Sequence, residues 1–409
     1  MDRMSYMVAV PSREEDLMEP ETLMERIRNM EYLQIFKLEL EEETIQLEAV
    51  YNETVYRAEI YPADFELPEL FRVQHFFPDV DSEELGERES GLAVDLMFAG
   101  DGMASYHFQL KLVDALLPGV LAVVDISSEK ILSGRWVGLA ASSAVPPAPR
   151  YLYTVQAVSG KEGTVWLHTH GLNRCGSVEL EILDSTVETY STHYSIIEMM
   201  ASRLIEKEEQ PGPWEPMFLA RLSEDALLVT TLLPWEDATE FYDEGILGGK
   251  SDRVDGHNED TCCIFTYTSG EALEEKQVSP VMVFDGLLEE NPVYMLSTRE
   301  TERMKSLAME RLSYVKQLAG SDDCEILVKI GLTVDEDGDS DGSEMEHIWF
   351  ELLELSDLAV KGKLTQEPYY VSDLHEGDIG EYPADRITDW IIFTEERRIT
   401  PDDVYLLEL

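Results

Sequence analysis

The sequence predicts a multidomain α+β protein, and three observations lead to this fold class. The chain of 409 residues is longer than the roughly 250 to 300 residues at which a single hydrophobic core stops growing. Its hydrophobic fraction of 44% is that of ordinary globular proteins. Segments of alternating apolar and charged residues, typical of half-solvated strands, are interrupted by segments with helical spacing. We expect ferredoxin-like or sandwich units, then a β-rich region, then a small C-terminal domain with a helix and an antiparallel sheet.

The first predicted unit covers residues 1–90. Its elements are a short strand at Tyr6–Val10 and a helix at Pro20–Met30, followed by three near-alternating segments that predict successive antiparallel strands. Those three segments are Leu33–Leu40, Ile45–Tyr51 and Tyr56–Tyr61. The acidic, proline-containing segment Pro78–Ser90 predicts a loop that ends the unit.

A second α+β unit is predicted over residues 91–209. A strand at Ala93–Phe98, a helix at about Ser105–Leu117 and a strand at Val120–Ile126 have the order of a βαβ half. Three more strands and a closing helix are predicted at Tyr151–Val158, Thr164–His170, Val178–Leu183 and Tyr190–Glu206.

Residues 210–296 form the predicted β-rich middle unit, which begins at the proline-rich break Gln210–Pro216. A polar excursion, Glu236–Asp260, separates its strands. Trp214 and Trp235 each precede a glutamate and lie near prolines. Because tryptophan is enriched at binding hot spots, both are candidate interaction residues, and the alternative is packing at a domain edge.

The last predicted domain covers residues 297–409, with one helix at Ser297–Leu318 followed by short antiparallel strands. Its spaced landmarks are Trp349, Gly362, Leu364, Pro368, Gly377, Asp378, Asp389 and Trp390. With these landmarks, residues 300–409 resemble the YegJ-like bacterial domain of unknown function. The upstream part resembles an uncharacterised bacterial family that carries such a domain at its C-terminus, through its WLHTHGL and VELEIL phrases. Neither resemblance implies an activity.

The charge of the chain restricts its partners. There are 84 Asp and Glu against 31 Lys and Arg, a formal net charge of -53. Such a surface repels nucleic-acid phosphates and anionic membranes, and it attracts basic proteins. We therefore expect no nucleic-acid or membrane partner. Two interpretations of the acidity stay open, an adaptation to salt or solubility and a surface that captures a basic partner.

The cysteines and the N-terminus predict a cytoplasmic location. Cys175, Cys262, Cys263 and Cys324 form no C-x-x-C pair, which favours reduced thiols. The apolar run near the N-terminus is too short for a signal peptide, and no window approaches eighteen apolar residues.

The segment Trp166–Asp184 holds the candidate metal ligands. His168 and His170 are two residues apart, which places both on one face of a strand, and Glu179 and Glu181 have the same relation on the next strand. If the strands pair in register, the four side chains could hold Zn or Fe. The alternative is a polar sheet face in which the imidazoles only form hydrogen bonds.

Two further patterns suggest chemistry less strongly. Cys175 follows Arg174, and a neighbouring cation lowers a thiol pKa, so a reactive cysteine with His170 as its base is an alternative reading. The acidic segment Asp335–Glu346 begins like a calcium-binding EF-hand loop, but Ile348 stands where a bidentate glutamate is needed, which favours a solvated hairpin tip.

No nucleotide-binding, hydrolase or zinc-protease motif appears in the sequence. We therefore expect a non-catalytic interaction protein for a basic protein partner, of which an immunity-type neutraliser of a basic toxin is one version. The alternative is a metal-dependent hydrolase centred on His168, His170, Glu179 and Glu181. Apart from that divalent metal, we expect no cofactor.

Overall fold

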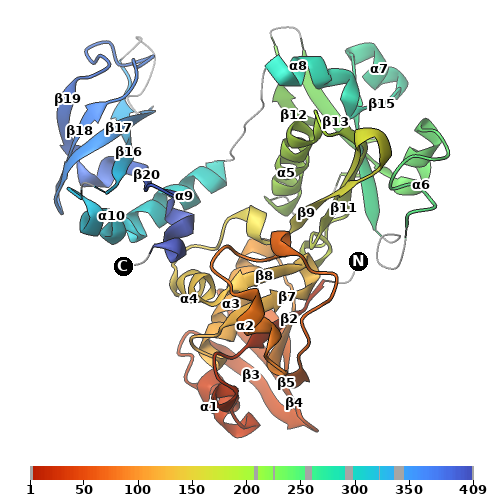
Figure 1. Cartoon of the computed structure of the whole chain (residues 1–409), viewed down its shortest axis with the longest axis vertical. Helices are drawn as coiled ribbons and strands as arrows, with labels where there is room; N and C mark the ends of the chain where they lie inside the picture. The colour runs from red at the N-terminus through yellow and green to blue at the C-terminus, as the bar shows by residue number, and fades with distance from the viewer. Residues whose placement is uncertain are drawn as a thin grey trace. The chain divides into compact units, whose positions relative to one another are not determined.

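A computed structural model describes residues 3–206, 211–223, 226–253, 260–290, 298–321, 323–335 and 345–407. The chain divides into two compact units. Unit 1 consists of Met1–Ala141 with Pro149–Met295, and unit 2 consists of Ser142–Ala148 with Leu296–Leu409. Unit 1 contains two sheets and unit 2 contains one, with helices beside each of them (Figure 1). The predicted multidomain α+β class is confirmed.

The first sheet of unit 1 has eight strands in the order β3-β4-β5-β6-β2-β7-β8, and β1 also pairs with β6. Their bounds are β1 Met4–Ser5, β2 Met7–Val10, β3 Gln34–Glu41, β4 Thr44–Tyr51, β5 Thr54–Asp64, β6 Ser90–Met97, β7 Ala122–Asp125 and β8 Lys130–Ser133. The predicted hairpin series of β3, β4 and β5 is confirmed. The helices that accompany this sheet are α1 Pro20–Arg28, α2 Ser82–Gly86, α3 Gly102–Leu116 and α4 Gly134–Ser142.

Two details of this sheet differ from the expectation. β2 lies between β6 and β7 and is antiparallel to both, so β6, α3 and β7 do not form a simple βαβ half with adjacent strands. β5 and β6 pair over eight positions, from Arg57 opposite Met97 to Asp64 opposite Ser90. The boundary predicted at residue 90 coincides with the first residue of β6, which pairs with β5, because pairing across the loop leaves no mark in the local sequence pattern.

The second sheet of unit 1 has the order β12-β13-β14-β11-β10-β9, and β15 pairs with β14. Its strands are β9 Thr154–Ser159, β10 Thr164–His170, β11 Glu179–Thr186, β12 Met217–Arg221, β13 Leu227–Pro234, β14 Thr261–Tyr267 and β15 Ser279–Pro280. The accompanying helices are α5 Tyr190–Glu206, α6 Trp235–Ala238, α7 Gly270–Glu275 and α8 Asp285–Glu290. β11 and β14 pair in parallel, so strands from the predicted second and middle units share one sheet.

Unit 2 contains an antiparallel sheet with the order β19-β18-β17-β16-β20-β21. The strands are β16 Glu325–Thr333, β17 Met345–Leu355, β18 Ala359–Leu364, β19 Ile379–Pro383, β20 Ile387–Phe393 and β21 Arg398–Ile399. The single helix expected before this sheet is two helices, α9 Thr298–Glu310 and α10 Leu312–Leu318. Arg311 stands between them, and its guanidinium donates to the carbonyl oxygen of Pro401 at 2.6 Å.

The sheet of unit 2 is open, and the indole of Trp390 fixes α9 on it. Trp390 is fully buried on β20, and its Nε1 donates to the carbonyl oxygen of Ala308 at 2.9 Å. Within the described parts of the chain, no helix has the length and apolar character needed to cross a membrane.

Candidate functional site

The strands of the segment Trp166–Asp184 pair as the sequence suggests. β10 and β11 are antiparallel, and His168 lies opposite Glu181. The rings of His168 and His170 are 4.9 Å apart between centroids in an edge arrangement. The structure thus brings His168, His170 and Glu181 to one region of the sheet. What each side chain contacts decides whether they could act together.

Glu181 forms a buried ion pair with an arginine from the polar excursion. Arg253 donates to both carboxylate oxygens of Glu181, at 2.9 and 2.5 Å, and both side chains are 1% exposed. The Arg253 guanidinium also lies 5.8 Å from the ring of Trp166 and 4.2 Å from that of Trp235. The carboxylate is therefore already balanced by a cation, which is what a buried charge requires.

Glu179 fixes the turn between β10 and β11. Its carboxylate accepts hydrogen bonds from the Thr169 hydroxyl at 2.6 Å and from the backbone amides of Gly171 at 2.8 Å and Asn173 at 3.1 Å. His170 approaches a different carboxylate, that of Glu129, with 3.8 Å between Nδ1 and Oε1. Among the described residues, no group of three or more His, Cys, Asp or Glu side chains is arranged to hold a metal ion.

Arg174 binds a buried carboxylate, and burial keeps the neighbouring Cys175 thiol protonated. Its guanidinium donates to both oxygens of Asp125 at 2.8 Å and to the Ser5 hydroxyl at 2.9 Å. Burial raises the pKa of the Cys175 thiol to about 12. Because only the thiolate is a good nucleophile, these contacts oppose the reading of Cys175 as a reactive cysteine.

The two candidate interaction residues, Trp214 and Trp235, are half-buried. Both pack against the core cluster that contains Trp166 and Phe265. The backbone carbonyl of Trp214 also accepts a hydrogen bond from the Tyr267 hydroxyl at 2.8 Å. Their surroundings are those of packing side chains at the edge of the second sheet.

A serine, a histidine and an aspartate form a connected network that the sequence did not suggest. The Ser185 hydroxyl lies 2.7 Å from Nδ1 of His193, and Nε2 of His193 lies 2.8 Å from Asp285. A nucleophilic serine must be reached by its substrate, and Ser185 is 1% exposed. We therefore interpret this network as a structural link between β11, α5 and α8.

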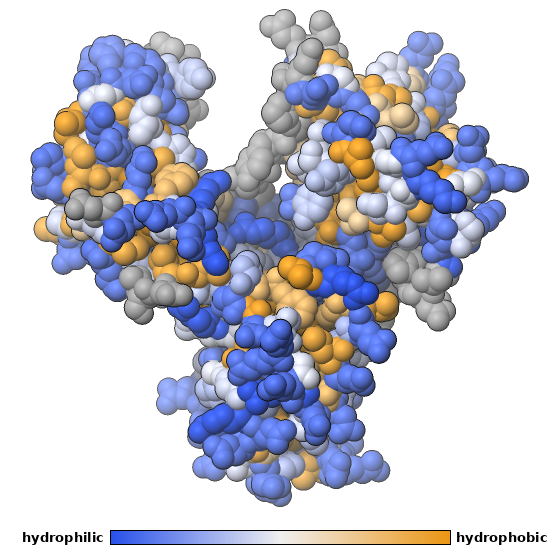
Figure 2. Space-filling view, in the orientation of Figure 1, coloured by the Kyte–Doolittle hydropathy of each residue, from blue (hydrophilic) through white to orange (hydrophobic). Residues whose placement is uncertain are grey.

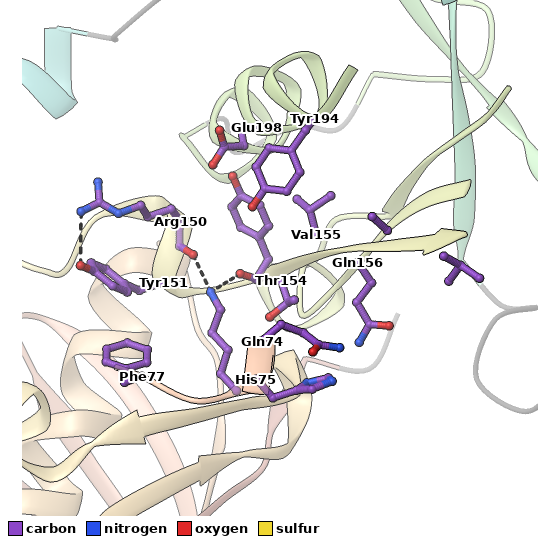
Figure 3. A pocket seen from close by; sticks show the side chains of 14 residues that line it. Gln74, His75, Phe77, Arg150, Tyr151, Thr154, Val155, Gln156, Tyr194 and Glu198 are labelled. Atoms are coloured by element: carbon purple, nitrogen blue, oxygen red, sulfur yellow. Dashed lines mark hydrogen bonds between the residues drawn. The ribbon is translucent and has the colours of Figure 1, made fainter. Parts of the chain in front are cut away.

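A cavity of about 650 Å³ lies within unit 1, and its lining residues do not include the predicted metal ligands, although Thr154 and Gln156 of the lining pair with His170 and His168. In Figure 3, Tyr194 and Glu198 project from α5 on one side, and Gln74 and His75 lie on the other. Residues of β9, including Thr154 and Gln156, form the wall between them. The volume is in the range of small-molecule sites.

Lys130 is the amine of this cavity. Its Nζ donates to the carbonyl oxygens of Arg150, at 2.6 Å, and of Tyr153. Burial lowers the pKa of Lys130 to about 7, and the positive charges of Arg174 and Arg150 act in the same direction, while Asp125 opposes them. At neutral pH a substantial share of this amine is therefore uncharged.

The other titratable groups of the cavity are also shifted by burial. Desolvation raises the pKa of the Glu198 carboxyl, although Arg150 and Lys130 counteract it. Desolvation raises the pKa of Tyr194 to about 12 and that of Tyr153 well above its ordinary value. Several neighbouring groups with perturbed pKa values in one cavity are a frequent property of functional sites.

Unit 2 presents a pair of exposed tyrosines, which we call the tyrosine surface. Tyr369 is 85% exposed and Tyr370 68% exposed, with ring centroids 6.4 Å apart. Their amide groups donate to the two carboxylate oxygens of Glu346, each at 2.8 Å. The Asp335 amide donates to the Tyr370 carbonyl at 2.9 Å, so the backbone of the pair is fixed by β17 and by the segment that follows β16. Most of the calcium-loop pattern, including Asp337, Asp339 and Asp341, lies outside the described residues.

The folds of the two units define a multidomain α+β protein, and three segments of it match domains of unknown function. Residues 5–147 match the N-terminal domain and residues 155–265 the C-terminal domain of a protein of unknown function, DUF4026. Residues 314–401 match DUF2314, an uncharacterised protein conserved in bacteria. The chain thus carries both domains of the DUF4026 family followed by a DUF2314 domain. No curated protein and no solved structure matches it.

These matches confirm the predicted resemblance to uncharacterised bacterial families at the coarse level. The DUF2314 match lies within residues 300–409, for which the sequence suggests a YegJ-like domain. The resemblance of this region to the YegJ-like domain stays a prediction.

Proposed function

We propose that the protein is a non-catalytic interaction protein that binds a basic protein partner, and that the tyrosine surface of unit 2 is a main contact. An immunity-type neutraliser of a basic toxin is one version of this function. The observation that carries the proposal is the outward display of Tyr369 and Tyr370 on a backbone held by Glu346. Rigid aromatic side chains at fixed positions lose little entropy on binding, which favours their use as anchors.

Charge complementarity supports the basic character of the partner. Between Lys363 and Arg386 the chain has six carboxylates and no Lys or Arg. Tyrosine rings attract ammonium and guanidinium groups, and nearby carboxylates add to that attraction. The face of the molecule in Figure 2 is covered mostly by hydrophilic residues, with apolar residues in small groups. Such a surface favours recognition through charge and a few aromatic anchors.

The contacts of the predicted metal ligands favour this function over the metal-dependent hydrolase. Glu181 is neutralised by Arg253, and Glu179 accepts from the Gly171 amide in the turn. Both carboxylates therefore already have partners within the protein. No specific contact of the described residues supports hydrolysis.

The test is a low-salt pull-down with the immobilised full-length protein from a bacterial lysate. We expect a basic protein to be enriched, to bind again after purification, and to be released by salt, because charge steering is screened by ions. The variant Tyr369→Ala/Tyr370→Ala should lose most of this binding.

Leu358→Ala is the matched control for that variant. Leu358 belongs to the same unit and is also 85% exposed, so its truncation removes exposed apolar area that is not part of the tyrosine surface. The control should bind as the wild type does. The proposal is wrong if no basic protein is enriched, or if the double variant retains full binding to the purified partner.

A further inference from the structure

The cavity of unit 1 combines an amine of fixed position with space for a ligand beside it. Lys130 lines the cavity and is half-buried, and its Nζ is fixed by the carbonyls of Arg150 and Tyr153. An uncharged amine that donates its two protons to these carbonyls has its lone pair on the remaining side. The geometry therefore holds a nucleophilic nitrogen in one orientation, which is how enzymes and binding sites prepare covalent reactions.

The surroundings of Lys130 contain the acid that amine condensation needs. Glu198 lies on the wall of the same cavity, and its carboxyl retains its proton to a higher pH than usual because of burial. The further charged or titratable groups near the amine are Asp125, Arg150, Tyr153, Arg174 and His75. The two arginines favour the neutral amine, and Asp125 and Glu198 favour the ammonium form.

The walls of the cavity indicate the class of ligand. Phe77, Tyr151, Tyr153 and Tyr194 line it, so its surface suits a planar aromatic body. Gln74 and Gln156 provide amide groups that could orient polar substituents. A volume of about 650 Å³ accommodates such a molecule.

We propose that the Lys130 amine condenses with the carbonyl group of an aromatic aldehyde bound in this cavity. The nitrogen lone pair attacks the carbonyl carbon to form the C–N bond. Glu198 gives its proton to the oxygen and regains one from the nitrogen as the carbinolamine forms, and it repeats this exchange in the dehydration step. The C–O bond breaks and the oxygen leaves as water, which carries the two protons that the amine has lost. The product is an imine, and no oxidant or reductant is required.

This inference goes beyond the proposed function and does not rest on it. The tyrosine surface belongs to unit 2, whereas Lys130 and every other residue named for the cavity belong to unit 1. Loss of partner binding by the tyrosine variant would therefore leave the reaction of Lys130 unaffected, and an inert Lys130 would leave partner binding unaffected.

The experiment uses the full-length wild-type protein with benzaldehyde and sodium cyanoborohydride, which reduces an imine to a stable secondary amine. Modification of each lysine is followed by peptide mass spectrometry as a function of pH, with exposed Lys161 as an internal comparator. At pH 7 about half of an amine of pKa about 7 is neutral, against roughly one in 2,500 for a lysine in water. We expect Lys130 to react at least about 10-fold faster than Lys161 at pH 7, with a rate that levels off above about pH 8.

Two variants complete the test. Glu198→Gln should slow the modification of Lys130 and leave Lys161 unchanged, because the proton donor is removed while the cavity is retained. Lys130→Arg keeps donors for both carbonyls and should abolish the fast modification at position 130. The proposal is overturned if Lys130 in the wild type reacts no faster than Lys161, or if its rate still rises above about pH 9 as that of an ordinary lysine does. The wild-type measurement decides the outcome even where a variant fails to fold.

Discussion

Several charged residues of this protein are buried in the fold and paired with a residue of opposite charge. Glu181 and Arg253 are 72 positions apart and form two hydrogen bonds inside the second sheet of unit 1. Removing one member of such a pair leaves an uncompensated charge in a poorly solvated place. The energetic weight of these residues is therefore large even though their role is structural.

Arg253→Ala is predicted to lower the free energy of unfolding by about 3 to 5 kcal/mol, as breaking a buried ion pair usually does. Urea denaturation followed by circular dichroism measures it. The control is Arg57→Ala, which breaks the solvent-exposed pair of Arg57 and Glu48. That change should cost less than about 1 kcal/mol. Equal effects of the two substitutions would contradict our view of Glu181 as a buried, paired carboxylate.

Asp389 provides a pH-dependent prediction in unit 2. Burial raises the pKa of its carboxyl to about 6, while its Oδ1 accepts from the Trp390 amide. The folded state therefore retains the proton that the unfolded state loses near about pH 4, and stability falls as the pH rises from about 4 to about 6. Above that range the carboxylate costs roughly 2 to 3 kcal/mol.

Asp389→Asn removes this cost and keeps an oxygen for the Trp390 amide. The variant should be more stable than the wild type at about pH 8, by roughly 1 to 3 kcal/mol, and the gain should shrink at about pH 5. Thermal unfolding at the two pH values gives the comparison, with exposed Asp385→Asn as the control. A gain that does not depend on pH would refute the assignment.

At the scale of elements, local periodicity was sufficient wherever an element is regular and amphipathic. α5 at Tyr190–Glu206 and β10 at Thr164–His170 have their predicted bounds. Such patterns do not predict which distant strands pair with each other. The parallel contact of β11 with β14 joins Glu179 to Thr261, and nothing in either strand specifies the other.

The candidate site shows the same limit. The sequence left open whether His168 and Glu181 would lie opposite each other, and β10 and β11 pair in the register that places them so. The sequence could not reveal that Arg253, inside an acidic loop, would neutralise Glu181. Lys130, Tyr153 and Glu198 come from three separate segments, and only the packing of β8, β9 and α5 turns them into one cavity.

β9 is an edge strand that carries no charged residue. It pairs with β10 on one side and ends the second sheet, and its six residues, TVQAVS, carry no charge. Edge strands are usually protected by charged side chains or proline. In high salt, where mutual repulsion of the acidic molecules is screened, we predict self-association through this edge. Ala157→Lys should suppress it in light scattering, and Ala63→Lys, on internal β5, should not rescue solubility.

The whole molecule carries a net charge of -53, and this charge opposes its own compact state. We predict that the melting temperature rises by several degrees when NaCl is increased from about 10 mM to about 200 mM, because the Debye length falls from about 30 Å to below about 10 Å. Differential scanning calorimetry provides the measurement. A melting temperature that is independent of salt would show that the acids are already balanced locally, which would weaken the interpretation of the acidity as an adaptation to salt.

The ion pair of Arg174 with Asp125 limits where a gene that encodes such a chain could be split. Asp125 lies in the part of unit 1 that matches the N-terminal domain of DUF4026, and Arg174 lies in the part that matches the C-terminal domain. A chain that ended between them would keep a wholly buried carboxylate without its cation. The two halves are therefore expected to be inherited together, and recombination should separate them from the DUF2314 domain more readily than from each other.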